Sequence, residues 1–338
     1  MDPGPEPARR RGLIARLGVW PMAFTLAGLA VFVAVIAYYG WNSTLRVLDH
    51  VSPGGFATYL AVQMAIIGGL STAWWLLLWQ RGRYPLLYWG RMVRDAAGQF
   101  LPFSHVGGFV LGARAVSIHG IAPTDAAAST MADIAVEFLA ELGFIGLGLL
   151  LLALRAPNSR LVLPVAIGLG AACLGAFGFI AIQRGGGRLF RALALRIANA
   201  GGGDASMQVD RLQAALDRIY QRRGRLLGAG LVHLACWFGT GFASFVAFHV
   251  LGVGISLLTA LAIEAILHAI LSAGFFVPGR VGVQEAAYAL LGAAFGIPPD
   301  IALSVSLLRR ARDLVIAVPV LFIWQGLEVR RLRPASGR

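Results

Sequence analysis

The sequence has few charged residues and no lysine. Charged residues make up 13% of its 338 residues, against roughly 25% in soluble domains, and hydrophobic residues make up 58%. This composition excludes a soluble fold and predicts an all-α polytopic membrane protein. All 29 basic residues are arginine, and the formal net charge is +13. Because the arginines lie between apolar segments, the excess indicates cytoplasmic loops and argues against nucleic-acid binding.

Cysteine and the common catalytic motifs are also scarce. Cys173 and Cys236 both lie in apolar segments, so no structural disulfide is expected. The six histidines form no metal-ligand pattern such as HExxH, and the sequence has no Walker motif. We therefore predict no metal, no cofactor, no ATP hydrolysis by this chain and no enzyme activity.

Six segments are long and apolar enough for membrane-spanning helices, which need about 20 residues. They belong to a single predicted transmembrane domain (residues 18–330), between a disordered basic N-terminus (1–17) and a C-terminal tail (331–338). The first segment lacks a cleavage site and is interpreted as a retained signal anchor. The segments are Gly18–Tyr39, Phe56–Trp79, Ala126–Leu154, Leu161–Ile182, Leu226–Leu251 and Ile301–Trp324.

Two further regions, Tyr84–His119 and Ser256–Phe295, are predicted to be helix pairs hinged at Pro102 and Pro278. Each pair could be re-entrant or could span the membrane twice. The two hinges repeat each other at an offset of 176 residues, and Gly-Ile-Ala-Pro at 120–123 aligns with Gly-Ile-Pro-Pro at 296–299. A repeated, proline-broken hydrophobic segment is typical of the binding centre of a transporter. The predicted repeats cover about 84–154 and 256–325, although chance similarity between two glycine-rich stretches is the alternative.

The distribution of arginine orients the chain. Both termini, the loop containing Arg81 and Arg83, and the long loop 184–225 are predicted to be cytoplasmic. Counting membrane crossings from these loops gives the two hinged pairs opposite orientations. The repeats therefore have inverted topology, a relation found in many alternating-access carriers.

The loop 184–225 contains an amphipathic stretch. Its apolar residues Val209, Leu212, Leu216 and Ile219 fall on one helical face. This pattern indicates either a basic helix lying on anionic lipid at the cytoplasmic leaflet or an ordinary solvated linker helix.

Acidic and basic residues occur inside the predicted spans. Asp133, Glu137 and Glu141 recur every four residues, so they share one face of a helix. At the repeat offset, Asp133 aligns with Arg309 and Glu137 with Asp313. Since unpaired charge in lipid is costly, we predict either salt bridges across the interface between the repeats or a role in transport coupling. The basic residues of the last span are Arg309, Arg310 and Arg312.

The hinges supply a second group of candidates. Helices that restart after each proline would direct their N-termini into the membrane, where these could receive an anionic headgroup. Close packing of small residues is the alternative. The residues of the hinge regions assigned to the translocation path are Pro102, His105, Gly107, Gly108, Arg114, Pro278, Gly279, Arg280, Gly282 and Glu285.

Two groups lie on the arms before the hinges. Glu264 and His268 are four residues apart and form either a protonatable pair or a buried structural contact. In the corresponding arm of the first repeat, Arg91, Arg94 and Asp95 are interpreted as a cytoplasmic entrance.

Three motifs, FLPFSHVGGFVLGARAVSIHGI, FFVPGRVGVQEAAYALLGAAFGIPP and SLLRRARDL, resemble the transmembrane-region family of lysylphosphatidylglycerol synthases, also called flippase-like proteins. The sequence VGVQEAAY followed by LLRRARD is similar to sequences of the branch associated with hopanoid biosynthesis. Pro278, Gly279, Gly282 and Glu285 fit the usual Pro-Gly-Gly-x-Gly-x-x-Glu motif, whereas Arg280 replaces a glycine. The resemblance implies a lipid-handling membrane domain, and because the chain ends at Arg338 we expect no synthase domain and no lysyl transfer.

The leading hypothesis is a translocator in the bacterial inner membrane that passes a lipid with an anionic or other polar headgroup between leaflets. A hopanoid-related lipid is one candidate substrate, and lipid-biosynthesis enzymes are candidate partners. The alternative is an integral-membrane enzyme or scaffold subunit acting on lipid intermediates, with Asp133 and Glu137 as acid and base. A third hypothesis is an assembly partner with no transport of its own.

Overall fold

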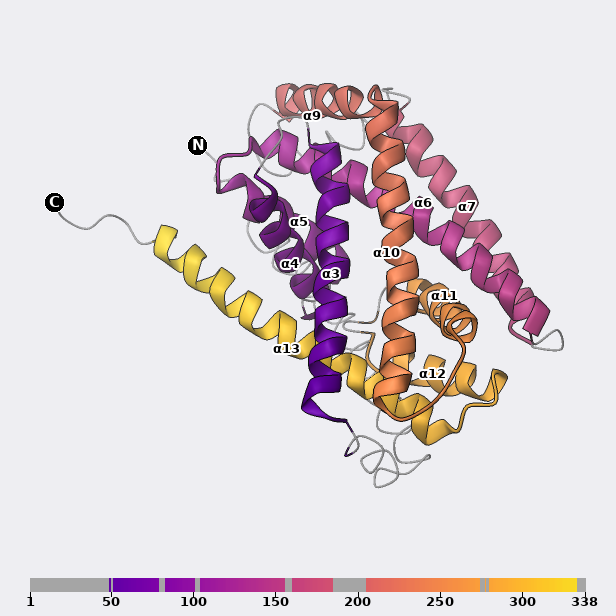
Figure 1. Ribbon diagram of the computed structural model, residues 1–338. Helices are drawn as coiled ribbons and strands as arrows, with labels where there is room; N and C mark the ends of the chain where they lie inside the picture. Colours follow the sequence, from indigo (N-terminus) through magenta and orange to yellow (C-terminus); the bar gives the residue numbers. More distant parts are fainter. Residues whose placement is uncertain are drawn as a thin grey trace, which may run out of the picture.

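The computed structural model describes residues 49, 51–78, 83–100, 104–155, 160–184, 205–273, 277 and 280–332. Within these ranges the chain is helical and contains no strand (Figure 1). The all-α class predicted from composition is confirmed. The helices are α3 (Pro53–Leu77), α4 (Tyr84–Phe100), α5 (Ser104–Ser117), α6 (Pro123–Arg155), α7 (Val162–Arg184), α9 (Ala205–Tyr220), α10 (Arg223–Val250), α11 (Leu257–Ala273), α12 (Val283–Ala294) and α13 (Pro299–Leu332).

Three of the described helices, α3, α6 and α10, are long and apolar enough to cross a membrane. They correspond to three of the six predicted spans. The span predicted at Leu161–Ile182 forms α7, in which the apolar stretch is the shorter Val162–Gly178. The span predicted at Ile301–Trp324 is helical within α13, but charged residues interrupt its apolar sequence. Gly18–Tyr39 and the N-terminal segment 1–17 lie outside the described residues.

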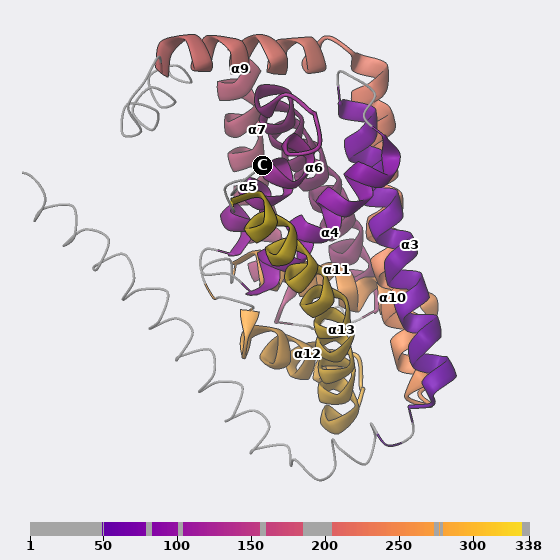
Figure 2. The same ribbon diagram turned by 90° about the vertical axis from the view of Figure 1, so that its left-hand side faces the viewer.

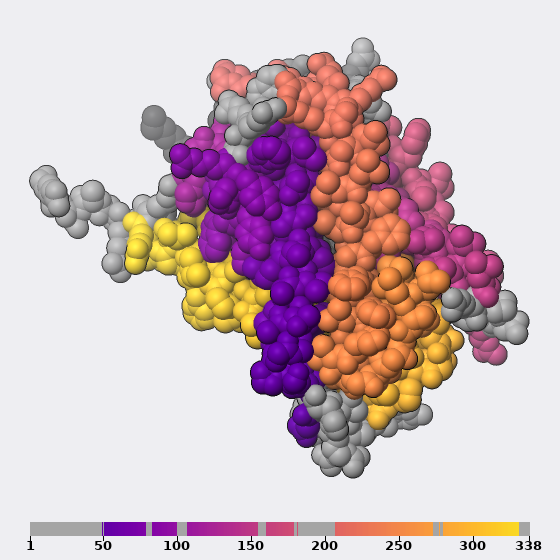
Figure 3. All heavy atoms as spheres, viewed as in Figure 1, coloured from indigo at the N-terminus to yellow at the C-terminus, as the bar shows by residue number. Residues whose placement is uncertain are grey.

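Helices α3 and α10 form an antiparallel pair on the face of the molecule seen in Figures 1 and 3. The helices of the first hinged pair, α4 and α5, lie toward the end of the molecule that carries α9. The second pair, α11 and α12, lies toward the opposite end (Figure 2). The long helices α6 and α13 each begin at the end where the preceding pair lies, so they run in opposite directions.

The helices of the two predicted repeats follow the same order at nearly the same offset. Helices α4, α5 and α6 of the first correspond to α11, α12 and α13 of the second. Pro123 begins α6 and Pro299, 176 residues later, begins α13. Gly120 and Gly296, at the turns before these prolines, both have positive φ, 99° and 70°, a conformation that glycine adopts without steric cost. The correspondence therefore extends to the backbone of the turns.

The amphipathic helix α9 packs on protein. Val209, Leu216 and Ile219 are buried in one cluster with residues of α3, α6 and α10. An ion pair between Arg218 and Asp125, with 3.3 Å between nitrogen and oxygen, joins α9 to the start of α6. The predicted apolar face is confirmed, but it covers the ends of other helices and is neither solvated nor left to meet lipid.

Helices α6 and α11 approach each other closely at Gly148. A Cβ atom added there would lie 2.3 Å from the Cβ atom of Ala265, so the two backbones can meet only because residue 148 has no side chain. Gly143, on the same helix, has no atom within 4 Å of such a position.

Gly148→Ala should therefore lower the free energy of unfolding by about 1–3 kcal/mol through overpacking. Gly143→Ala is the matched control, and it should be neutral or stabilising by up to about 1 kcal/mol through helix propensity. Thermal unfolding of both variants in detergent measures the difference. Equal melting temperatures would contradict the close approach of α6 and α11.

Candidate functional site

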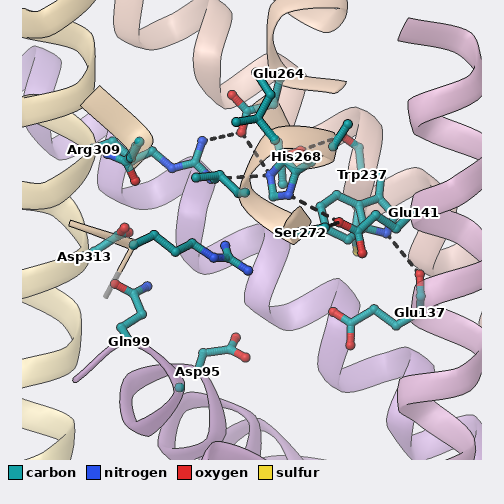
Figure 4. A pocket seen from close by; sticks show the side chains of 18 of the residues that line it. Asp95, Gln99, Glu137, Glu141, Trp237, Glu264, His268, Ser272, Arg309 and Asp313 are labelled. Atoms are coloured by element: carbon teal, nitrogen blue, oxygen red, sulfur yellow. Dashed lines mark hydrogen bonds and ion pairs between the residues drawn. The ribbon is translucent and has the colours of Figure 1, made fainter. Parts of the chain in front are cut away.

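A cavity of about 1230 Å³ lies among α3–α7 and α10–α13. Part of its wall is apolar and includes Leu161, which precedes α7, and the α7 residues Val165 and Leu169. The remainder carries ionisable side chains from both predicted repeats, several of which point toward one another (Figure 4). The ionisable lining residues are Arg91, Arg94, Asp95, Glu137, Glu141, Glu264, His268, Arg280, Arg309, Arg310, Arg312 and Asp313.

The first charge cluster joins α4 to α6. Arg91 forms two hydrogen bonds with the Glu137 carboxylate, at 2.7 and 3.1 Å, and a third with Asp95 at 3.0 Å. Arg94 bridges the two acids of α6, donating to Asp133 Oδ2 at 2.5 Å and to Glu137 Oε2 at 2.6 Å. Guanidinium groups that bridge carboxylates in this way compensate charge that an apolar bundle could not otherwise hold.

Helix α10 completes this first cluster. His233 Nε2 lies 2.9 Å from Asp133 Oδ1, and both side chains are fully buried. One turn later, the Trp237 indole N–H donates to the backbone carbonyl of Glu137 at 3.4 Å. Asp133 is thus held between α4 and α10, behind the wall of the cavity.

The second cluster joins α11 to α13. Arg309 forms an ion pair with Glu264, and Glu264 Oε1 lies 3.3 Å from His268 Nε2. The prediction that Glu264 and His268 share a face and interact is confirmed. The Trp237 ring meets the His268 ring edge to face, with 4.5 Å between centroids.

The third cluster surrounds Glu285, at the start of α12. The fully buried Glu285 carboxylate forms an ion pair with Arg310 and accepts the backbone N–H of Gly282 at 2.8 Å. Gly282 has φ of 80° and is the N-cap residue. The positive end of α12 is therefore occupied by a side chain of the same helix.

A further pair anchors α13 on α3. Arg312 forms an ion pair with its neighbour Asp313 at 2.6 Å and donates to the Tyr59 hydroxyl at 3.0 Å. Its guanidinium also lies over the Tyr59 ring, 5.0 Å from the centroid.

Glu141 connects the two predicted repeats. Its carboxylate on α6 accepts a hydrogen bond from the Ser272 hydroxyl of α11 at 3.0 Å and lies 3.7 Å from His268 Nδ1. Among the described residues, Glu141 forms no salt bridge with an arginine, which sets it apart from Asp133 and Glu137.

The structure corrects two predictions about these charges. The prediction that Asp133 and Glu137 form salt bridges across the interface between the repeats is wrong. Both acids pair with arginines of α4, within their own predicted repeat. The interpretation of Arg91 and Arg94 as a cytoplasmic entrance is also wrong, since both are 4% exposed. A guanidinium this deep in an apolar bundle requires carboxylate partners, and these are Glu137 and Asp133 on α6 together with Asp95 on α4.

The predicted path residues therefore divide into groups. Most of the charged ones line the cavity, whereas Asp133 and Glu285 lie fully buried behind its wall. Arg114 is not at the cavity, because it forms an exposed ion pair with Glu328. Gly107, Gly108 and Gly282 do not line the cavity either; a Cβ atom at Gly108 would lie 2.5 Å from the Arg94 carbonyl oxygen, as close helix packing requires. Pro102, Pro278, Gly279 and the side chain of His105 lie outside the described part of the chain.

Sequence reasoning missed His233 and Trp237. Each is a single polar or aromatic residue in an apolar span, about 100 residues away from its α6 partner. No spacing pattern could have joined them. The one available signal was their separation by four residues, which places both on one face of α10.

Asp133, Glu137 and His233 could geometrically hold a metal ion, since one ligand atom of each lies within 4.8 Å of the others. Both carboxylates already accept hydrogen bonds from Arg91 or Arg94. A cation entering this cluster would meet two guanidinium groups, so the arrangement fits an ion-pair network better than a metal site.

Comparison with known families places the chain in a membrane-protein family. Residues 25–320 match the family described as Lysylphosphatidylglycerol synthase TM region. The chain belongs to this family. No curated protein matches the sequence. Family membership and the apolar helices together identify a membrane protein of a lipid-related family.

The full burial of Asp133 predicts a mainly structural role. Asp133→Asn should lower the free energy of unfolding by about 3–5 kcal/mol, because Arg94 and His233 lose their charged partner in a buried site. Glu328→Gln breaks an exposed pair and should leave the melting temperature nearly unchanged. Thermal unfolding in detergent compares the variants. A normal melting temperature for Asp133→Asn would contradict the structural role.

Proposed function

We propose that this protein moves a polar lipid between the leaflets of a membrane by passing its headgroup through the cavity. The observation that carries the proposal is one cavity lined by ionisable groups from two helix sets and by an apolar wall on α7. Lipid translocation requires a polar path for the headgroup, while the acyl chains remain in an apolar environment. Membership of a lipid-related membrane family supports the same function.

We propose further that α4–α6 and α11–α13 are inverted repeats, with α4–α5 and α11–α12 as re-entrant pairs. Their matched order and the equivalent turns at Gly120 and Gly296 support duplication. Helices α5 and α12 contain 14 and 12 residues, fewer than the roughly 20 needed to span. With the cytoplasm on the side of α9, as its arginines indicate, both termini are cytoplasmic.

Cysteine accessibility tests the inverted topology. In a background with Cys173 and Cys236 replaced by alanine, His119→Cys lies at the turn before α6 and Pro298→Cys at the turn before α13. A membrane-impermeant thiol reagent should label His119→Cys from the cytoplasmic side only and Pro298→Cys from the opposite side only. Labelling of both from one side would exclude inverted repeats.

We propose the bacterial inner membrane as the location. The motifs VGVQEAAY and LLRRARD are similar to the branch of the family associated with hopanoid biosynthesis. Hopanoid-related lipids are therefore candidate substrates, and enzymes of lipid biosynthesis are candidate partners. Proton coupling through the carboxylates and passive scrambling are the two energy sources consistent with a chain that has no Walker motif.

Leaflet exchange of labelled lipids in liposomes tests the function. Glu141→Gln should slow exchange about tenfold, the equivalent of ~1.4 kcal/mol, because a charge on the headgroup path is lost. The variant should fold normally, since the residues in contact with Glu141 are a serine and a histidine and no arginine loses its salt bridge. Glu328→Gln, which lies away from the cavity, is the matched control. Exchange at the same rate in liposomes with and without the folded wild-type protein would refute translocation.

A second candidate function is catalysis on a lipid intermediate, which the buried histidine–carboxylate pairs favour. His233–Asp133 and His268–Glu264 are groups of the kind that transfer protons in enzymes. Mass spectrometry of lipids incubated with the protein separates the two functions. A chemically modified lipid would indicate an enzyme, whereas an unmodified lipid redistributed between leaflets supports a translocator.

A further inference from the structure

The imidazole ring of His268 lies between two carboxylates that belong to different helices. Its Nδ1 atom lies 3.7 Å from Glu141 Oε1 of α6, and its Nε2 atom lies 3.3 Å from Glu264 Oε1 of α11 (Figure 4). The His268 side chain is 9% exposed and that of Glu264 1%. A proton on this ring is therefore stabilised by a negative charge at each nitrogen.

The Nε2 atom of His268 has a partner in each of its protonation states. Arg309 Nη2 of α13, which can only donate a hydrogen bond, lies 3.4 Å from Nε2. Without a proton, Nε2 can accept the hydrogen bond from Arg309; with a proton, it can donate to Glu264. A buried polar atom without a partner is costly, and here neither the gain nor the loss of the proton leaves Nε2 in that state.

The charges in contact with the ring leave room for one more positive charge. Glu141 and Glu264 contribute two negative charges and Arg309 contributes one positive charge. Among the described residues, Glu264 Oε2 has no hydrogen-bond partner, so this buried acid is compensated through Oε1 alone. A proton on His268 balances the charges of the four side chains in a site where uncompensated charge is costly.

The next neighbours of this group include uncharged side chains and one further pair of opposite charges. The uncharged ones are the Trp237 ring of α10, the Ser272 hydroxyl of α11 and the Tyr288 hydroxyl of α12. Arg280 and Asp313 both lie within electrostatic range of Arg309. Their charges are opposite and offset each other, so they do not supply the missing positive charge.

Helices α6 and α11 are packed tightly on this side of the ring. Glu141 meets Ser272, and two helical turns away Gly148 meets Ala265 at a distance that only glycine permits. The Glu141 carboxylate is therefore held close to the His268 ring by its own helix pair. A charge gained or lost at His268 acts directly on the contact between the two predicted repeats.

We propose that His268 binds an exchangeable proton and that this proton strengthens the link between α6 and α11 beside the cavity. His268, Glu141 and Glu264 all line the cavity, which gives water a route to the ring. A hydronium ion gives its proton to the Nε2 lone pair, an N–H bond forms, and water remains; release reverses the step. The imidazolium pairs with Glu141 of α6 and Glu264 of α11 together, whereas the neutral ring carries no charge for either acid.

The control of lipid passage by this proton rests on the proposed function, whereas the proton site itself does not. The test of the site is ¹⁵N magnetic resonance of the full chain, labelled at its six histidines and reconstituted in liposomes. The His268 signals are assigned by their loss in His268→Gln. We expect them to change from the imidazolium to the neutral pattern between about pH 5 and about pH 9. A ring that keeps one protonation state over this range would overturn the proposal.

A carboxylate variant tests the surroundings of the ring. Glu141→Gln should lower the ratio of imidazolium to neutral His268 about tenfold at the same pH, because one of the two negative charges is lost. The variant breaks no salt bridge with an arginine among the described residues. Glu328→Gln, away from the cavity, is the matched control and should leave the ratio unchanged. An unchanged ratio in folded Glu141→Gln would refute the contact with α6.

Leaflet exchange at about pH 6 and about pH 8 separates the proton site from the proposed function. Wild-type exchange should differ between the two conditions, and folded His268→Gln should exchange at a rate that no longer depends on pH. The same pH dependence in His268→Gln would refute control by this proton. Titration of His268 without any leaflet exchange would refute translocation and leave the proton site standing. Exchange without titration of His268 would refute the proton site and leave translocation standing.

Discussion

The structure depends on compensating charge inside an apolar bundle. Arginines on α4 hold the acids of α6, and arginines on α13 hold acids of α11 and α12. Removing one member of such a pair leaves an uncompensated charge, which is far costlier in an apolar environment than in water. Ion pairs therefore help to fix the geometry of these helices around the cavity, together with apolar packing.

The same constraint acts three times along α6. Its three acids, one turn apart, have three different surroundings: Asp133 is enclosed between α4 and α10, Glu137 is held by two arginines at the edge of the cavity, and Glu141 faces the second helix set. Along this one helical face, Asp133 is fully buried and holds other helices in place, whereas Glu141 lines the cavity.

Much of the fold could be predicted from the sequence. Apolar run length located α3, α6 and α10, and the repeated Gly-Ile-x-Pro motif marked the turns before α6 and α13. The pairing of charges could not be predicted, because helical periodicity gives the face of a residue but not the helix opposite it. No pattern in the sequence therefore pairs Asp133 with Arg94 or with His233. The packing of α9 could not be predicted either, because the sequence does not show which helices end beside it.

Passage of a headgroup through the cavity is the central proposal, and the accessibility of Ser272 tests it most directly. Ser272 lines the cavity and contacts Glu141. In a background with Cys173 and Cys236 replaced by alanine, a membrane-impermeant thiol reagent should modify Ser272→Cys when applied to either side of the membrane, because a headgroup path between the leaflets must be reachable from both sides. Modification from one side only, or from neither, in a folded and reconstituted protein would contradict the account.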